Sequence, residues 1–139
     1  MVEHIKREAK HRYGEELQIN WEKTREIEQE EKYVKFNRWC DEQGIIRPAC
    51  RYPVAFGEKG ELTGVSANHE IGLGEAYIFV PVKCIINESK FRRDPQIGHL
   101  LKKYPELFRK NANADHIVVI FFLMHEMSKG EDSYWYHYL

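Results

Sequence analysis

The chain has 139 residues, of which 42% are hydrophobic and 13% aromatic, which suits one domain with a buried core. Its formal net charge of −1 gives no electrostatic reason to expect binding to nucleic acid or to an anionic membrane. The three cysteines lack the CxxC spacing of zinc sites and are odd in number, which favours a reducing intracellular compartment, the cytoplasm or the nucleus. No apolar signal segment follows Met1, and the longest apolar run, residues 117–124, is far shorter than the ~20 residues of a membrane span.

The first third of the chain is predicted to be helical. Residues 1–31 are highly charged and lack an apolar stripe, so we expect a solvated helical lead-in to a domain over residues 32–139. An apolar face at helical spacing predicts a helix over about 22–43, with only its second half firmly packed, and Gly44 stands where that helix would end. The apolar face consists of Tyr33, Phe36, Trp39 and Cys40.

The middle of the chain is predicted to form a small antiparallel β unit. Two glycines in "GEKGE" favour a hairpin turn, because glycine readily adopts positive φ. Gly72-Leu73-Gly74-Glu75 resembles a phosphate-binding loop, but no helix begins after it, so we interpret it as a turn between strands. Residues 76–81 carry apolar side chains on both faces, which predicts a central strand. The strands are expected at 52–56, 62–67, 76–81 and 83–86.

The last part of the chain is predicted to be helical, which makes the fold class α+β. Asp94-Pro95 is a typical helix start, and Pro105 would end that helix. A final helix is expected from about residue 114 to Lys129, because Gly130 suits a helix end. The residues expected in the core are Ile78, Val80, Ile97, Leu101, Ile117, Phe121 and Met124.

The residues alone predict no catalytic set and no metal site. His125-Glu126 begins like a zinc-binding HExxH motif, but Lys129 replaces the second histidine, so a helix-surface pair is the simpler interpretation. Cys84 is most simply a small buried hydrophobe. The basic cluster of Lys90, Arg92 and Arg93 is expected to be a solvated helix entrance.

The chain ends in an aromatic cluster from Trp135 to Leu139, which would form a large apolar surface. These residues either fold back on the domain, or they are covered by a partner or by further chain. We favour the view that the 139 residues are the front part of a longer protein.

Two sets of residues stand in a specific order and spacing along the chain. They are Glu61, Gly64, Val65, Ala67, Ile71, Gly74, Glu75, residues 77–80 and Pro81, and later Lys129, Gly130, Ser133 and Trp135. They match the patterns E-G-x-G-[LV]-x-A, followed by I, GE, an apolar run and proline, and later [KR]-G-x-x-S-x-W. Over roughly residues 30–139 the chain therefore resembles the SET-domain protein methyltransferases of the Rubisco large-subunit methyltransferase and actin-histidine methyltransferase type.

The resemblance implies a SET-type β unit and the use of S-adenosylmethionine as methyl donor for a protein substrate. Glu61 and Thr63 would contact the cofactor, and Gly64 would permit close approach of the backbone. Leu62 departs from the family, which has a glycine there. The family's "NH" segment and C-terminal tyrosine lie beyond the equivalent of Leu139, so this chain alone is expected to be inactive. The acceptor is open between lysine and histidine.

Two other interpretations remain. In the first, the chain is a degenerate SET-derived module that binds a partner through its aromatic end. Leu62, which stands in place of the family's glycine, favours this interpretation. In the second, the chain is an unrelated α+β interaction domain. The genomic sequence just after codon 139 separates these interpretations, because an "NH" segment there would favour the enzyme.

Overall fold

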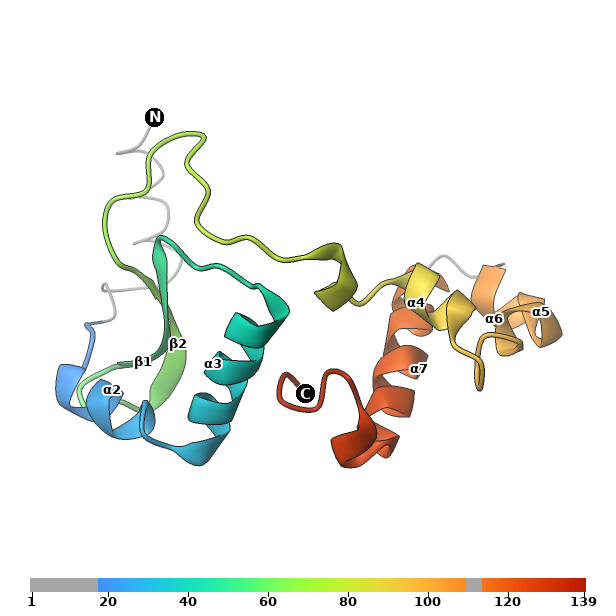
Figure 1. Cartoon of the computed structure of the whole chain (residues 1–139), viewed down its shortest axis with the longest axis horizontal. Coiled ribbons are helices and arrows are strands. Elements are labelled where there is room, and N and C mark those ends of the chain that lie inside the picture. The colour runs from blue at the N-terminus through green and yellow to red at the C-terminus, as the bar shows by residue number, and fades with distance from the viewer. Residues whose placement is uncertain (1–17, 110–113) are drawn as a thin grey trace. The chain divides into compact units, whose positions relative to one another are not determined.

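The structure is a computed structural model that describes residues 18–109 and 114–139 (Figure 1). It contains helices and a small antiparallel sheet, so the predicted α+β class is confirmed. The chain divides into two compact units, and the boundaries fall after residues 38, 45 and 79. The first unit has residues 18–38 and 46–79, and the second has 39–45 and 80–139. Most of the predicted lead-in, residues 1–17, lies outside the described residues.

The helix predicted over 22–43 is in fact two helices, α2 (Trp21–Ile27) and α3 (Glu31–Gln43). The side chain of Asn20 caps α2 by accepting a hydrogen bond from the Lys23 amide at 2.9 Å. The expectation that only the second half of this region packs is wrong, since α2 lies against the sheet and buries Thr24 and Ile27 (Figure 1). The Oγ1 atom of Thr24 accepts a hydrogen bond from the Ala55 amide at 3.0 Å.

The first two predicted strands are confirmed as β1 (Cys50–Phe56) and β2 (Leu62–Ala67), an antiparallel pair. The turn between them uses Gly57 and Gly60, with φ of 93° and 66°, conformations that glycine adopts without a steric penalty. β1 is the more buried strand, and Val54 and Ala55 are fully buried. Within the described parts of the chain the sheet consists of these two strands.

The predicted third and fourth strands are wrong. Among the described residues, the segment 76–81 pairs only through Phe79, whose amide and carbonyl bond to Ile46 at 2.7 and 3.1 Å. Tyr77 and Phe79 are 56% and 54% exposed, so this segment is not central. Residues 83–86 overlap a short 3-10 helix, Val82–Cys84. Apolar side chains on both faces of this segment favoured a central strand. A strand also needs a neighbour to pair with, and no strand of the described chain supplies one.

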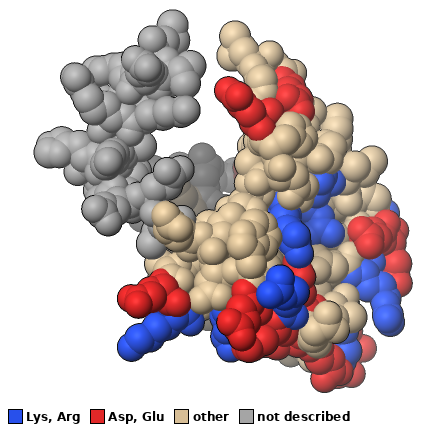
Figure 2. Space-filling view, turned by 90° about the vertical axis from the view of Figure 1, so that its left-hand side faces the viewer, with Lys and Arg blue, Asp and Glu red and all other residues tan. Residues whose placement is uncertain are grey.

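Charged side chains of both signs are interspersed on the face of the molecule in Figure 2. Close ion pairs occur in the first unit, at 2.8 Å between Lys23 and Glu26 and at 2.6 Å between Lys35 and Glu31. In the described ranges, no helix is both long and apolar enough to cross a bilayer.

The second unit is helical, with α7 (Ala114–Ser128) at its centre. Helices α4 (Glu88–Arg93) and α6 (Pro105–Arg109) pack against α7 (Figure 1). The predicted final helix is therefore confirmed. It is followed by a 3-10 turn, Gly130–Asp132, in which Gly130 has a φ of 56°.

The helix predicted to start at Asp94 is confirmed only in part. Asp94 does cap a turn, because its carboxylate accepts hydrogen bonds from the amides of Gln96 and Ile97 at 2.8 and 3.0 Å. The helix itself, α5, is only Leu100–Lys103. A β-carbon at Gly98 would lie 2.6 Å from the Arg92 carbonyl oxygen, so the chain turns tightly there before the helix begins. Pro105 ends this segment and starts α6.

The predicted core is correct for Leu101 and wrong for most other positions. Ile78, Val80, Phe121 and Met124 are exposed, and Ile97 and Ile117 are half-buried. Helix α7 is apolar on nearly all sides over 117–124, so periodicity does not select one face. The face actually buried carries Val118, Phe122 and Glu126. Other buried side chains of this unit are Trp39, Cys40, Cys84, Phe91, Phe108 and Trp135.

Two adjacent phenylalanines test which face of α7 is buried. Phe122 is 2% exposed and its ring contacts Trp135, whereas Phe121 is 39% exposed. We expect Phe122→Ala to lower the free energy of unfolding by ~3–5 kcal/mol and Phe121→Ala by about 1 kcal/mol. Urea unfolding of both variants measures this, and a larger loss for Phe121→Ala would contradict the assigned face.

Candidate functional site

The three residues predicted to bind cofactor lie at the start of β2. Thr63 is exposed, Gly64 is half-buried, and Glu61 is exposed at the end of the turn. The Glu61 carboxylate folds back on its own turn and accepts a hydrogen bond from the Lys59 amide at 3.1 Å. Glu61 would therefore have to leave this bond to reach a ligand. Leu62, the position that departs from the family pattern, is 50% exposed.

Packing within the hairpin explains a glycine at position 64, whether or not a ligand binds there. It lies opposite Val54 in the hairpin, and a β-carbon there would be 3.2 Å from the Phe56 ring. A larger side chain would force that ring to move. A substitution of Gly64 therefore tests packing as well as ligand binding, and Thr63 is the cleaner position.

The segment from Gly72 to Glu75 is a turn, as predicted, but it joins no pair of strands. The Glu75 amide bonds to the Gly72 carbonyl at 3.1 Å, and the Glu75 carboxylate accepts from the Gly72 amide at 2.9 Å. The Glu75 carboxylate also lies 2.8 Å from His69 Nε2. These bonds from His69 and Gly72 lower the pKa of Glu75. The glutamate thus stabilises the turn in the region that the resemblance describes as a strand-to-strand link.

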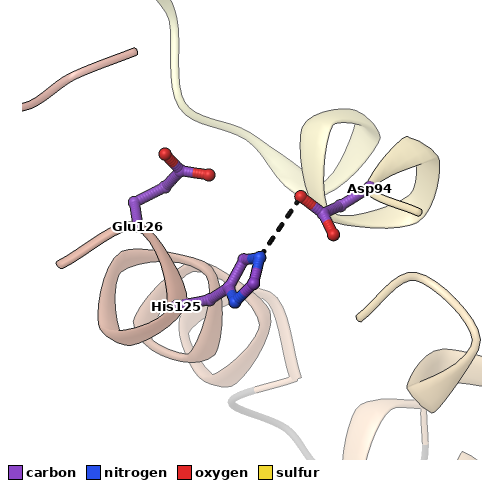
Figure 3. Close-up of side chains that lie close together, drawn as sticks. All are labelled: Asp94, His125 and Glu126. Atoms are coloured by element: carbon purple, nitrogen blue, oxygen red, sulfur yellow. Dashed lines mark ion pairs between the residues drawn. The ribbon is translucent and has the colours of Figure 1, made fainter. Parts of the chain in front are cut away.

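The most buried polar group of the second unit is Glu126, on α7. The sequence predicted His125-Glu126 to be a surface pair, and this is wrong, because Glu126 is only 2% exposed. Figure 3 shows the imidazole of His125 directed at the carboxylate of Asp94, which belongs to the turn after α4. The distance from His125 Nε2 to Asp94 Oδ2 is 3.4 Å, and the geometry is not that of a hydrogen bond.

Lys129 is the cation that neutralises this cluster. Its Nζ lies 2.5 Å from Glu126 Oε1 and 3.4 Å from Asp94 Oδ2. Burial works against the charge, but the hydrogen bonds and charges of Glu126 and Asp94 outweigh it and raise the pKa of Lys129. For Asp94, burial is likewise outweighed by its two backbone hydrogen bonds and by Lys129 and His125, so its pKa is lowered. Both shifts favour the charged forms of Asp94 and Lys129.

Asp94, His125 and Glu126 have ligand types and spacing that could suit a metal ion, since one atom from each lies within 4.8 Å of the others. The ammonium of Lys129, however, already lies between the two carboxylates. The second Glu126 oxygen accepts from Ser133 Oγ at 2.7 Å. A metal would have to displace both partners of Glu126, so these residues fit a metal poorly.

Ser133 and Trp135 extend the network into the C-terminal segment. Ser133 Oγ also accepts a hydrogen bond from the Trp135 amide at 3.1 Å. The Trp135 indole donates to the Cys84 carbonyl at 2.9 Å, and Trp135 is buried. Nearby, the Trp39 indole donates to the Tyr134 carbonyl at 3.1 Å. The residues of the K-G-x-x-S-x-W pattern thus attach the C-terminal segment to α7 and to the 3-10 helix.

A cavity of about 510 Å³ opens beside this network. Three of its lining residues, Phe122, Glu126 and Trp135, are buried. One wall is formed by the 3-10 helix and α4 and carries Lys83, Lys90 and Arg93. The basic cluster predicted to be a solvated helix entrance is therefore divided, because Lys90 and Arg93 line the cavity, whereas Arg92 pairs with Glu88.

Sequence reasoning missed both the buried network and the cavity. A signal was present for Glu126, which follows Phe122 by four residues and Val118 by eight, on one helix face. Lys129 lies three residues further on, within reach of a helical ion pair. The contribution of Asp94 comes from a distant turn, and local spacing gives no indication of it.

The network predicts an asymmetry between single and double substitutions. Lys129→Met leaves two carboxylates without their cation, and we expect a loss of about 3 kcal/mol in unfolding free energy, the low end for a buried pair because Lys129 is 27% exposed. The double variant Lys129→Met with Glu126→Gln should regain part of that loss. The control Lys23→Met removes a cation whose partner Glu26 is exposed, so it should change stability far less than Lys129→Met does. Equal losses for Lys23→Met and Lys129→Met in chemical unfolding would refute the network.

Comparison of the chain with protein-family models, with curated proteins and with solved structures gives no match. The functional argument therefore rests on the residues of this chain, their geometry and the motif resemblance described above.

Proposed function

We propose that the chain is the front part of a SET-type methyltransferase that transfers a methyl group from S-adenosylmethionine to a lysine or histidine of a protein substrate. Glu61, Thr63 and Gly64 would line one wall of the cofactor pocket. The order and spacing of two motif sets over roughly residues 30–139 support the proposal. The SET-type β unit itself belongs to the proposal, since the sheet of the described residues consists of β1 and β2 alone.

The observation that carries the proposal is that the residues of the K-G-x-x-S-x-W pattern have structural roles in the fold. Lys129 and Ser133 hold the two oxygens of the buried Glu126, and Trp135 bonds to the Cys84 carbonyl. Gly130 has the positive φ that favours glycine. Lys129, Gly130, Ser133 and Trp135, the residues of this second motif, thus each have a structural role in the fold.

The exposed apolar segment after the Gly72–Glu75 turn gives further support. Ile78, Phe79 and Val80 have the composition of a central strand but are exposed and are paired only at Phe79. In the proposed enzyme, the later part of the SET domain would pair with this segment and complete the pocket. Methyl transfer needs the acceptor nitrogen in line with the sulfonium methyl group, inside a channel that excludes water. The proposal assigns that channel to the later part, so the 139 residues alone should be inactive.

One observation favours the alternative, a SET-derived module that binds a partner without catalysis. Tyr136, Tyr138 and Leu139 are exposed at the aromatic end, and Leu62 replaces the family's glycine on an exposed strand position. A partner protein that covers the aromatic end would account for these side chains. The cofactor titration below separates the two proposals, because a binding module has no reason to interact with S-adenosylmethionine at 61–64.

We expect a titration of the isotope-labelled chain with S-adenosylmethionine to give weak, saturable NMR shifts centred on residues 61–64. The dissociation constant should be no tighter than about 1 mM, on the order of −4 kcal/mol, because half a pocket encloses little of the ligand. Thr63→Val removes one hydroxyl from an exposed position at constant shape, and it should weaken the binding. The control is the reverse exchange Val65→Thr, two residues along the same exposed face.

Three results would count against the proposed function. The first is the absence of shifts at 61–64 up to about ten times the expected dissociation constant. The second is equal binding by the parent chain and the Thr63→Val variant. The third is micromolar binding by these 139 residues, which would mean that the pocket is already complete within them.

A further inference from the structure

The cavity of the second unit has an excess of positive charge on one wall. Both Lys83 and Arg93 line the cavity, and among the described residues no hydrogen bond or ion pair engages the side-chain cation of either. Lys90 is held in place, because its Nζ donates to the Lys83 carbonyl at 3.0 Å and lies 5.6 Å from the centre of the Trp135 ring. Three cationic side chains therefore converge on one opening, and only one of them is already engaged.

The acidic residues of the cavity do not cancel this charge. Glu126 is neutralised by Lys129 and bonded to Ser133, and Asp94 is bonded to two backbone amides and lies 3.4 Å from Lys129. Asp132 is exposed and is the remaining acid of the lining. An anion in the cavity would therefore lie near carboxylates that already have partners, and near lysine and arginine side chains whose N–H donors are not all used.

Two of the buried residues that line the cavity are aromatic. These are Phe122 and Trp135, with ring centroids 5.4 Å apart. A volume of about 510 Å³ lies within the range of roughly 300–1,000 Å³ that is usual for small-molecule sites. An apolar body would thus contact the rings while an anionic group faced the cations.

We propose that this cavity binds a small organic anion, in which one phosphate or carboxylate group is carried on an apolar or aromatic body. The site is separate from the proposed cofactor wall at 61–64 and does not depend on methyltransferase activity. The anionic group of the ligand would be held by Lys83, Lys90 and Arg93. The same chemistry could come from a free small molecule or from a phosphorylated side chain of a peptide.

Phenyl phosphate is the direct probe, in an NMR titration of the full chain. We expect saturable shifts at Lys83, Lys90 and the Trp135 indole, with a dissociation constant of about 1 mM. Arg93→Gln should weaken binding by about tenfold, through the loss of a charge-assisted contact. The matched control is Arg92→Gln, the same charge change on the neighbouring residue, which pairs with Glu88 instead of lining the cavity.

Further probes separate the parts of the proposal. Inorganic phosphate and neutral benzyl alcohol should each bind at least about tenfold more weakly than phenyl phosphate, since each lacks one half of the ligand. A short peptide with a central phosphotyrosine identifies the source: tighter binding than phenyl phosphate indicates a peptide ligand, and equal or weaker binding indicates a free small molecule.

The inference is overturned if phenyl phosphate gives no saturable shifts, or if the shifts lie outside the cavity. Equal weakening by Arg92→Gln and Arg93→Gln would also overturn it, since it would mean that only net charge matters. Shifts at residues 61–65 with S-adenosylmethionine concern the proposed function alone, so the failure of one proposal can be distinguished from the failure of the other.

Discussion

The buried carboxylate of Glu126 is the constraint on which the second unit depends. An ionised group with 2% exposure is costly unless its oxygens are bonded. One oxygen takes the ammonium of Lys129 and the other takes the hydroxyl of Ser133. Because Lys129 also approaches Asp94, and Ser133 also accepts from the Trp135 amide, the carboxylate links α7, the turn after α4 and the C-terminal segment. The cavity beside it is lined by residues of all three elements.

The first unit depends on a smaller polar contact. Thr24 is fully buried on α2, and its hydroxyl donates to the Asn20 carbonyl at 2.7 Å while it accepts from the Ala55 amide at 3.0 Å. The Asn20 amide in turn donates to the Ala55 carbonyl at 2.9 Å. These bonds fix α2 on β1, the inner strand of a two-stranded sheet. A hairpin alone is marginally stable in water, so the helix that covers it is part of the same structural element.

The sequence predicted best those elements that are specified locally. The β1–β2 hairpin follows from two turn glycines between two short strand candidates, and α7 follows from its length and its end near Gly130. The strand expected at 76–81 failed because strand formation needs a partner, and composition cannot supply one. The buried face of α7 was misassigned because residues 117–124 are apolar on nearly all sides. The buried face is the one whose Phe122 ring contacts Trp135, which comes from another part of the chain. The cavity was missed for the same reason, since Lys83, Arg93 and Trp135 are brought together only by the fold.

Hydrogen exchange of the Trp135 indole N–H, which is bonded to the Cys84 carbonyl, tests most directly whether Glu126 holds the C-terminal segment in place. Ser133→Ala removes the hydroxyl that joins Glu126 to the Trp135 amide, and the account predicts at least about tenfold faster exchange of that indole. The Ala55 amide, which bonds to Thr24 in the first unit, is the internal reference and should exchange at an unchanged rate. Unchanged exchange of the Trp135 indole in the Ser133→Ala variant would contradict the account.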